Sequence, residues 1–280
     1  MSSFAQNSEI VDRPPPAARG WSRERIVGNA LVAIWALFGL GLLLFLIRAW
    51  DPDLFEKYAP LYLRGVGVTL SLVGMSIAIG AILSIPIAFA RMSRNSVLNA
   101  ISYAYVYFFR GTPLLAQAFL IYYGFGSFRP QLEAVGLWSF FREAWYCAVL
   151  AFSLNTAAYQ AEILRGAIES VPRGQWESAA SLGLSKFLTM RKIILPQALK
   201  IVIPPLVSIF ISLFKDTSLV VIIGIFDLTL AAKAALSDAA WRGFGVEAYI
   251  FISLIYFVFC FSMSKYSQAL ERRLQTGHSR

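Results

Sequence analysis

The chain has 280 residues, of which 58% are hydrophobic and 15% are charged, and its mean hydropathy is +0.62. Soluble globular domains usually have about a quarter charged residues, so this composition excludes an ordinary soluble enzyme or binding domain. The formal net charge of +9 comes from Lys and Arg that flank apolar segments, and it gives no argument for nucleic-acid binding.

Six apolar segments follow one another along the chain. Four contain no charge, at residues 28–47, 65–90, 144–161 and 248–264, and two are interrupted by charge, at 95–128 and 201–226. A membrane-spanning helix needs roughly 20 mostly apolar residues, and each segment is near or above that length. We therefore expect an all-α integral membrane protein with six transmembrane helices. They are placed near residues 27–48, 63–91, 96–125, 144–166, 197–226 and 247–267, with outer loops near 49–62, 126–143 and 227–246.

The distribution of Lys and Arg predicts which side of the membrane each loop faces. With both termini in the cytoplasm, sixteen of the 25 basic residues lie in cytoplasmic segments, seven lie outside and two lie within spans. Cytoplasmic loops carry an excess of Lys and Arg, so this orientation is favoured. We expect a cytoplasmic tail at residues 1–27, a transmembrane domain at 28–270 and a cytoplasmic tail at 271–280. The first span is expected to be uncleaved, because Arg48 and Trp50 stand where a signal peptide has small residues.

A polar, basic loop joins the fourth and fifth spans, and its pattern predicts two short helices separated by a tight turn. Pro172 suits the first turn of a helix, Gly183 can take the left-handed conformation that ends it, and Ser185 is placed to cap the second helix. That second helix is expected to stop near Leu195, because Pro196 disfavours a helical conformation in the residue before it.

This loop, at residues 171–196, also carries a spaced motif, E-x-A-x3-G-x9-I-x-L-P. Its members are Glu177, Ala179, Gly183, Ile193, Leu195 and Pro196. The motif resembles the cytoplasmic loop by which permease subunits of bacterial ATP-driven (ABC) importers dock onto their ATPase. The alternative is an ordinary solvated loop with an incidental glutamate.

Three further segments resemble the polar amino acid permeases of that superfamily, the histidine, glutamine and basic amino acid type. They are residues 161–175, which enter the loop, residues 109–115 (FRGTPLL) and residues 215–219 (KDTSL). The resemblance covers about residues 63–270. Ser178 stands where the pattern has a second alanine, and the first span with its tail is an addition to the five-span members.

The resemblance implies a permease subunit of an amino acid importer in the bacterial inner membrane, working by alternating access. It implies three kinds of partner: two ATP-binding cassette subunits, a periplasmic solute-binding protein, and a second permease, identical or related. ATP and Mg²⁺ would then be bound by the ATPase subunits and no cofactor by this chain. Histidine, basic amino acids and opines all remain open as solutes.

Two charged residues inside the membrane are candidates for the solute path. A charge at the bilayer centre costs about 2.5–3.5 kcal/mol on insertion scales, so such groups usually face a path or a partner. Arg110 and Asp216 offer both signs of charge, as a zwitterionic amino acid requires. Four further residues are candidates for added hydrogen bonds, namely Thr112, Asn155, Tyr159 and Thr217. The alternative is a structural ion pair of Asp216 with Arg110 or with Lys215.

Motifs of catalysis and of nucleotide binding are absent from the sequence. It contains no G-x4-G-K-[ST] phosphate loop and no G-x-S-x-G elbow, and its single histidine is His278. A metal centre and a catalytic centre are therefore not expected, and ATP hydrolysis is assigned to another chain. An ion-coupled secondary transporter is the alternative function. It predicts inverted repeats and membrane acids, and apart from Asp216 the sequence shows neither.

Overall fold

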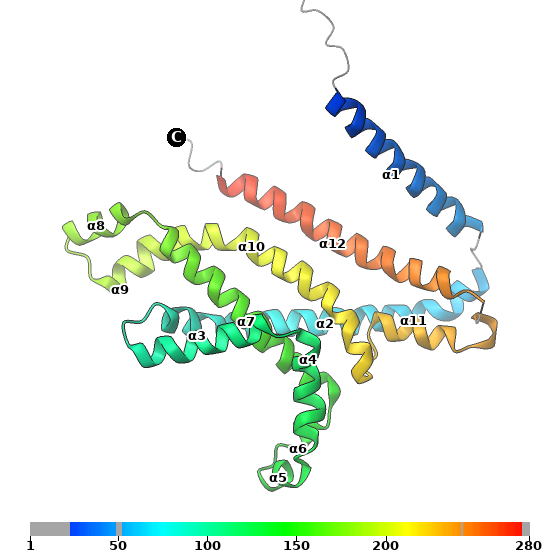
Figure 1. Cartoon of the computed structure of the whole chain (residues 1–280), viewed down its shortest axis with the longest axis horizontal. Coiled ribbons are helices and arrows are strands. Elements are labelled where there is room, and N and C mark those ends of the chain that lie inside the picture. Colours follow the sequence, from blue (N-terminus) through cyan, green and yellow to red (C-terminus); the bar gives the residue numbers. More distant parts are fainter. Residues whose placement is uncertain (1–22, 49–51, 242, 276–280) are drawn as a thin grey trace, which may run out of the picture. The chain divides into compact units, whose positions relative to one another are not determined.

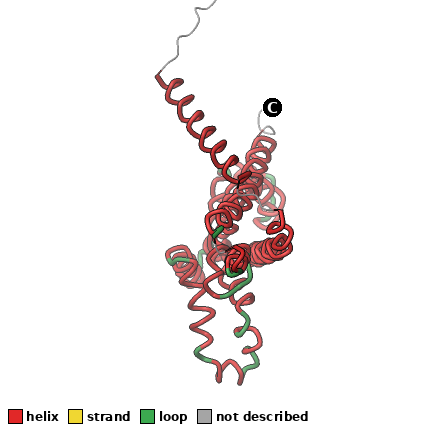
Figure 2. Tube along the Cα trace, turned by 90° about the vertical axis from the view of Figure 1, so that its right-hand side faces the viewer, coloured by secondary structure: helices red, strands yellow, loops and turns green. Residues whose placement is uncertain are grey.

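The computed structural model of the chain describes residues 23–48, 52–241 and 243–275, and within these ranges the regular structure is helical, with no strand (Figures 1 and 2). The expectation of an all-α protein is confirmed. The chain divides into two units, Met1–Asp51 and Pro52–Arg280.

The first unit is described over a single helix, α1 (Arg23–Arg48). Its apolar side chains are exposed along its length, including Trp35 and Phe38. A helix of 26 residues with apolar side chains on all sides suits a lipid environment. Residues 1–22 of the predicted cytoplasmic tail lie outside the described part of the chain, and α1 begins within that tail, at Arg23.

The second unit holds the other helices. They are α2 (Pro52–Arg91), α3 (Ser96–Gly111), α4 (Leu114–Phe119), the π-turn η1 (Leu120–Gly124), α5 (Arg129–Ala134), α6 (Trp138–Phe141), α7 (Ala144–Ser170), α8 (Arg173–Ser181), α9 (Lys186–Thr189), the π-turn η2 (Met190–Ile194), α10 (Leu195–Asp216), the 3₁₀ segment η3 (Thr217–Ile223), α11 (Leu228–Leu236), the short η4 (Ala239–Trp241) and α12 (Gly245–Gln275).

Within the described part of the chain, four helical stretches are long and apolar enough to cross a membrane. They are Ile26–Phe45, Glu56–Arg91, Lys186–Ile223 and Gly245–Leu274. The predicted count of six spans is not confirmed, because the segments at 96–125 and 144–166 fall outside this set. The second of these forms α7, which has 27 residues but carries buried polar groups such as Asn155 and Gln160. Because α7 packs against α2, α3, α4 and α10 rather than against lipid alone, it need not be uniformly apolar.

Three predicted boundaries are wrong. The span at 96–125 is broken between α3 and α4, where Thr112 and Pro113 have extended ψ angles of 146° and 134°, as expected for a residue before proline and for proline itself. The predicted outer loop at 49–62 is helical from Pro52, because Tyr58 and Tyr62 pack into a buried cluster with α11 and α12. The last helix passes residue 267 and continues to Gln275, since no breaker intervenes and its final turn is basic.

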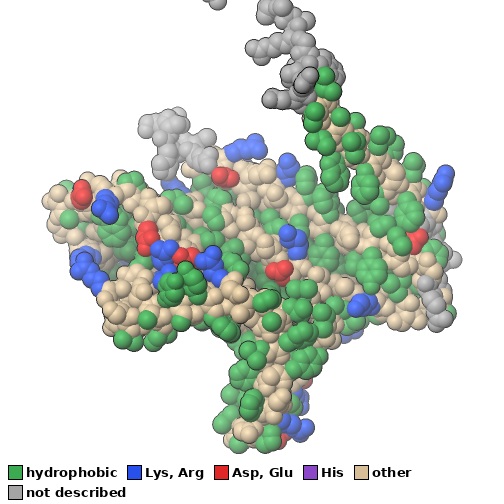
Figure 3. All heavy atoms as spheres, in the orientation of Figure 1, with side chains coloured by type: hydrophobic (Ala, Val, Ile, Leu, Met, Phe, Trp, Pro, Cys, Tyr) green, Lys and Arg blue, Asp and Glu red, His purple; other side chains and the backbone are tan. Residues whose placement is uncertain are grey.

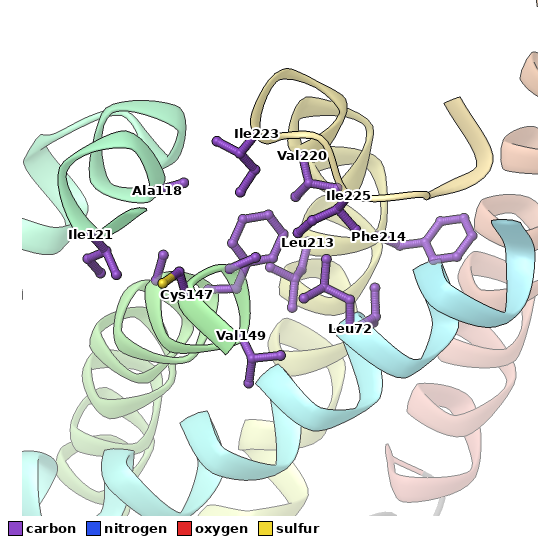
Figure 4. Packing of buried hydrophobic residues seen from close by; sticks show 14 residues of the cluster. Leu72, Ala118, Ile121, Cys147, Val149, Leu213, Phe214, Val220, Ile223 and Ile225 are labelled. Carbon is purple, nitrogen blue, oxygen red and sulfur yellow. The ribbon is translucent and has the colours of Figure 1, made fainter. Parts of the chain in front are cut away.

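The core of this unit lies where α2, α7 and α10 meet. Figure 4 shows Leu72 of α2, Cys147 of α7 and Leu213 of α10 in one cluster, and all three are buried. Small residues on α7, among them Ala148 and Ala151, bring the neighbouring helices close, as is typical of membrane helix packing. This arrangement leaves α7 and α10 as the two helices that connect the core to the loop between them.

Candidate functional site

The loop between α7 and α10 has the predicted helix–turn–helix start. α8 follows Pro172, and Gly183 ends it with a φ of +72°. The Gly183 N–H donates to the Ala180 carbonyl (2.9 Å) and the Leu184 N–H to the Ala179 carbonyl (3.1 Å). This pair of bonds is the Schellman arrangement that closes helix C-termini.

The second helix of the loop starts as predicted but does not end as predicted. Ser185 caps α9 by accepting a hydrogen bond from the Leu188 N–H (3.3 Å). The helix does not stop near Leu195, because the wider turn η2 carries it into α10. In η2 the Leu195 N–H donates to the Met190 carbonyl, five residues back. A π-turn accommodates Pro196, which offers no N–H and would clash with the carbonyl four residues before it.

The six motif residues lie on different sides of this loop. Glu177, Gly183 and Pro196 are exposed, and Ile193 and Leu195 are partly buried. Ala179 is 1% exposed, so its side chain faces into the subunit and its place on the docking face stays a prediction. Behind the loop, Ile194 and Ala198 of η2 and α10 pack with Ile168 of α7, which fixes the loop to both of its flanking helices.

Two apolar residues of the loop were not singled out from the sequence. Leu182 is 78% exposed and Phe187 is 72% exposed, one on each side of Gly183. Both lie outside the spans predicted from the sequence, and Phe187 stands at the very start of the apolar stretch Lys186–Ile223, next to its N-terminal end. Their position beside the turn glycine, in an otherwise polar and basic segment, is the sequence signal that would have identified them. Figure 3 shows that Lys, Arg, Asp and Glu side chains gather over the end of this unit that carries α8.

A cavity of about 480 Å³ lies between α4, α7 and α10. Four of the six predicted path residues line it, namely Thr112, Asn155, Tyr159 and Asp216. The others that line it are Pro113, Leu114, Leu115, Thr156, Ser208, Ile209, Ser212, Leu213 and Leu219. This volume is within the range of about 300–1,000 Å³ that is usual for small-molecule sites.

The remaining two predicted path residues, Arg110 and Thr217, do not line the cavity. The Arg110 guanidinium lies over the Tyr159 ring, 5.2 Å from its centre, and so stands next to the cavity wall. Thr217 is fully buried, and its hydroxyl donates to the Phe214 carbonyl (2.7 Å), which makes it part of the helix end rather than of the cavity.

Some polar side chains of the cavity form hydrogen bonds within the protein, whereas Asp216 forms no ion pair with any described residue. The Thr112 hydroxyl donates to the Phe108 carbonyl (2.7 Å), and the Asn155 amide donates to the Phe109 carbonyl (2.8 Å). Among the residues that the structure describes, Asp216 forms no ion pair, so neither alternative pair, with Arg110 or with Lys215, is formed. This favours the cavity-lining hypothesis for Asp216, which stays a prediction.

The chain is similar to known transport proteins over most of its length. Residues 76–276 match the family described as the binding-protein-dependent transport system inner membrane component. The chain belongs to this family. It is 43% identical over 215 residues to a nopaline transport system permease protein of Agrobacterium fabrum, covering 77% of this chain and 88% of the relative. It is 39% identical over 219 residues to an L-cystine transport system permease protein of Bacillus subtilis, covering 78% and 88%.

A solved structure of an amino acid ABC transporter with histidines has a chain that is 37% identical to this one, with a TM-score of 0.69. The match covers 80% of this chain and 99% of the other. The protein is therefore a multi-pass permease subunit of an ABC importer assembly. Family membership favours this function over the ion-coupled secondary transporter.

Proposed function

We propose that this permease moves a polar amino acid or an opine across the bacterial inner membrane by alternating access, with both termini and the α8–α9 loop in the cytoplasm. Two relatives support the solute class by their names, which specify nopaline and L-cystine. The cavity supports it by its chemistry, since Asp216 lines the wall and Arg110 stands beside it. A zwitterion needs groups of both signs, and a carboxylate pairs well with a guanidinium.

The partners follow from the same proposal. Two ATP-binding cassette subunits bind ATP and Mg²⁺ and contact the α8–α9 loop, a periplasmic solute-binding protein delivers solute to the outer face, and a second permease, identical or related, completes the path. This chain itself needs no cofactor and is not an enzyme.

The observation that carries the proposal is the pair of exposed apolar side chains beside the turn of the loop. Leu182 and Phe187 present apolar surface in a polar segment, and in the proposed assembly the ATPase covers this surface, as large exposed apolar patches are often covered by partner proteins. Glu177, which is exposed on α8, adds a carboxylate for a basic partner residue.

The helices that leave the loop connect it to the cavity. α9, η2, α10 and η3 form one helical stretch, Lys186–Ile223, and its far part carries Asp216 at the cavity wall. α7 leaves the other end of the loop and carries Tyr159. A force on the loop therefore reaches two walls of the cavity through continuous helices, which is the coupling that ATP-driven alternating access requires.

Replacing Leu182 and Phe187 together by serine tests the docking surface. Burying one such side chain contributes roughly 1.5–3 kcal/mol, so the double variant should reduce copurification of the ATPase by about tenfold or more. Leu137→Ser is a control, because Leu137 is also an exposed leucine, at 50%, but lies between α5 and α6. Retention of the ATPase at the wild-type level by the double variant would contradict the proposed docking surface.

A further inference from the structure

Gln117 on α4 does not line the cavity, but it makes more side-chain hydrogen bonds than any predicted path residue, and two of its partners, Thr112 and Asn155, line the cavity. It is 4% exposed, and its amide nitrogen lies within hydrogen-bond distance of the Phe109 carbonyl (2.9 Å), the Thr112 carbonyl (3.1 Å) and the Thr112 hydroxyl (2.8 Å). Its amide oxygen accepts from the Asn155 amide (3.1 Å), which also donates to the Phe109 carbonyl (2.8 Å). The two amides thus converge on the break between α3 and α4.

The break leaves a backbone carbonyl without its usual hydrogen-bond donor. In a continuous helix the Phe109 carbonyl would accept from the N–H of residue 113. That residue is Pro113, which has no N–H, so the carbonyl loses its backbone donor. Gln117 is buried at this point, and a buried carbonyl without a donor is costly. Gln117 and Asn155 supply the missing donors, one from each side of the break.

The same arrangement sets the place of Arg110. This residue lies between Phe109 and Thr112, both of which accept hydrogen bonds from Gln117. Its guanidinium rests over the ring of Tyr159. Asn155 and Tyr159 are four residues apart on α7 and therefore share a helix face. One face of α7 thus holds the backbone of the break through Asn155 and the arginine side chain through Tyr159.

We propose that Gln117 and Asn155 are positioning residues, which hold the α3–α4 break in place and thereby aim Arg110 at the solute cavity. The inference rests on the proposed function, in which this cavity holds the solute. Neither amide nitrogen needs to touch the solute, because both are engaged with the break.

The test uses the complete importer, with its ATPase and binding protein, in proteoliposomes, and measures solute moved per ATP hydrolysed. Gln117→Met keeps the size of the side chain and removes its donors, so we expect a fall of about fivefold or more, as for a buried acceptor left without its donor. Asn155→Leu should act in the same direction. Gln131→Met, at an exposed position of α5, should leave the ratio unchanged.

The same substitution in an Arg110→Ala background tells whether Gln117 acts by positioning Arg110 or only by stabilising the fold. If Gln117 acts through Arg110, then adding Gln117→Met to Arg110→Ala should cause no further fall. A full multiplicative fall in the double variant would overturn the inference. So would Gln117→Met complexes that assemble in lower yield but move wild-type amounts of solute per ATP, since that is the result of a purely structural role.

Normal transport by Arg110→Ala would count against the role of Arg110 in the proposed function. In that case the position of the break can still be measured directly, by thiol labelling. Leu115 lines the cavity, so Leu115→Cys, with Cys147 and Cys260 replaced by alanine, reports the position of the segment after the break. Gln117→Met should change the rate of thiol labelling at this site by at least about threefold, since loss of the donors displaces the break. An unchanged rate would show that the amide pair does not position it.

Discussion

One backbone conformation sets the angle between α8 and α9, the two helices of the proposed docking loop. Gly183 has a φ of +72°, a region that costs a non-glycine residue roughly 1–2 kcal/mol, and a β-branched residue is the least tolerant of it. Open space surrounds its Cα, so a side chain there would meet no steric clash. The restriction at this position is therefore conformational.

Gly183→Val should leave membrane insertion intact and abolish the stimulation of ATP hydrolysis by the solute-binding protein. The strained φ angle would shift the end of α8 and with it Leu182, which lies directly before the turn. Gly166→Val is a suitable control, because Gly166 lies within α7 without a positive φ and also has open space around it. Normal stimulation in the Gly183 variant would refute the docking role of this turn.

Local chemistry explains which single residues were predictable. Gly183 and Ser185 were assigned correctly, because helix termination and capping depend on neighbours within a few positions. Gln117 was missed, since its partner Asn155 is 38 positions away in the sequence. The burial of Thr217 was missed for a similar reason, because it depends on how η3 packs rather than on the KDTSL sequence that contains it.

At the scale of helices, a charged cluster joins the C-terminal end of α2 to α3 and to the C-terminal part of α7. Arg165 pairs with Glu162 and, at 2.5 Å, with Glu169 on the same helix. Arg91 at the end of α2 lies 3.6 Å from Glu162 and stacks on the ring of Tyr103 of α3, 4.8 Å from its centre. Glu162 thus connects two basic residues from different helices.

Glu162→Gln should lower the thermal midpoint of the purified subunit in detergent. The side chains of Arg91, Glu162 and Arg165 are only 12–24% exposed, so we expect a loss of about 1–2 kcal/mol, between the values for exposed and buried ion pairs. That corresponds to a decrease of about 2–8 °C for a chain of this size.

Glu133→Gln provides the matched control for that measurement. Glu133 pairs with Arg129 at 2.7 Å, but these side chains are 47% and 63% exposed, so the change should be within about 1 °C. Equal midpoints for wild type and the Glu162 variant would show that the charged cluster does not join these helices.

The boundaries of helices were predictable only where local signals act alone. Pro113 does break the third predicted span, whereas Pro196 does not stop α9, since η2 widens the backbone and packing of Ile194 holds it. The extension of α2 to Pro52 depends on Tyr58 and Tyr62 meeting α11 and α12. Such long-range packing is not visible in hydropathy.

At the scale of the whole molecule, the proposed function depends on one loop and one cavity, which two helices join. The membrane class, the loop and its turn were predictable, because apolar length and motif spacing are properties of the linear sequence. The cavity was predictable in part, since four of its thirteen lining residues were named in advance. Its serines on α10 and the amide pair at the break require the folded arrangement.

The most direct test is solute uptake by proteoliposomes that contain the purified permease. With the ATPase subunits, the solute-binding protein and ATP on the side of the α8–α9 loop, uptake should occur, and omission of ATP or of any partner should abolish it. The result that would contradict an ATP-driven permease is uptake by this chain alone under a Na⁺ or H⁺ gradient, at a rate that ATP and the partner proteins do not raise.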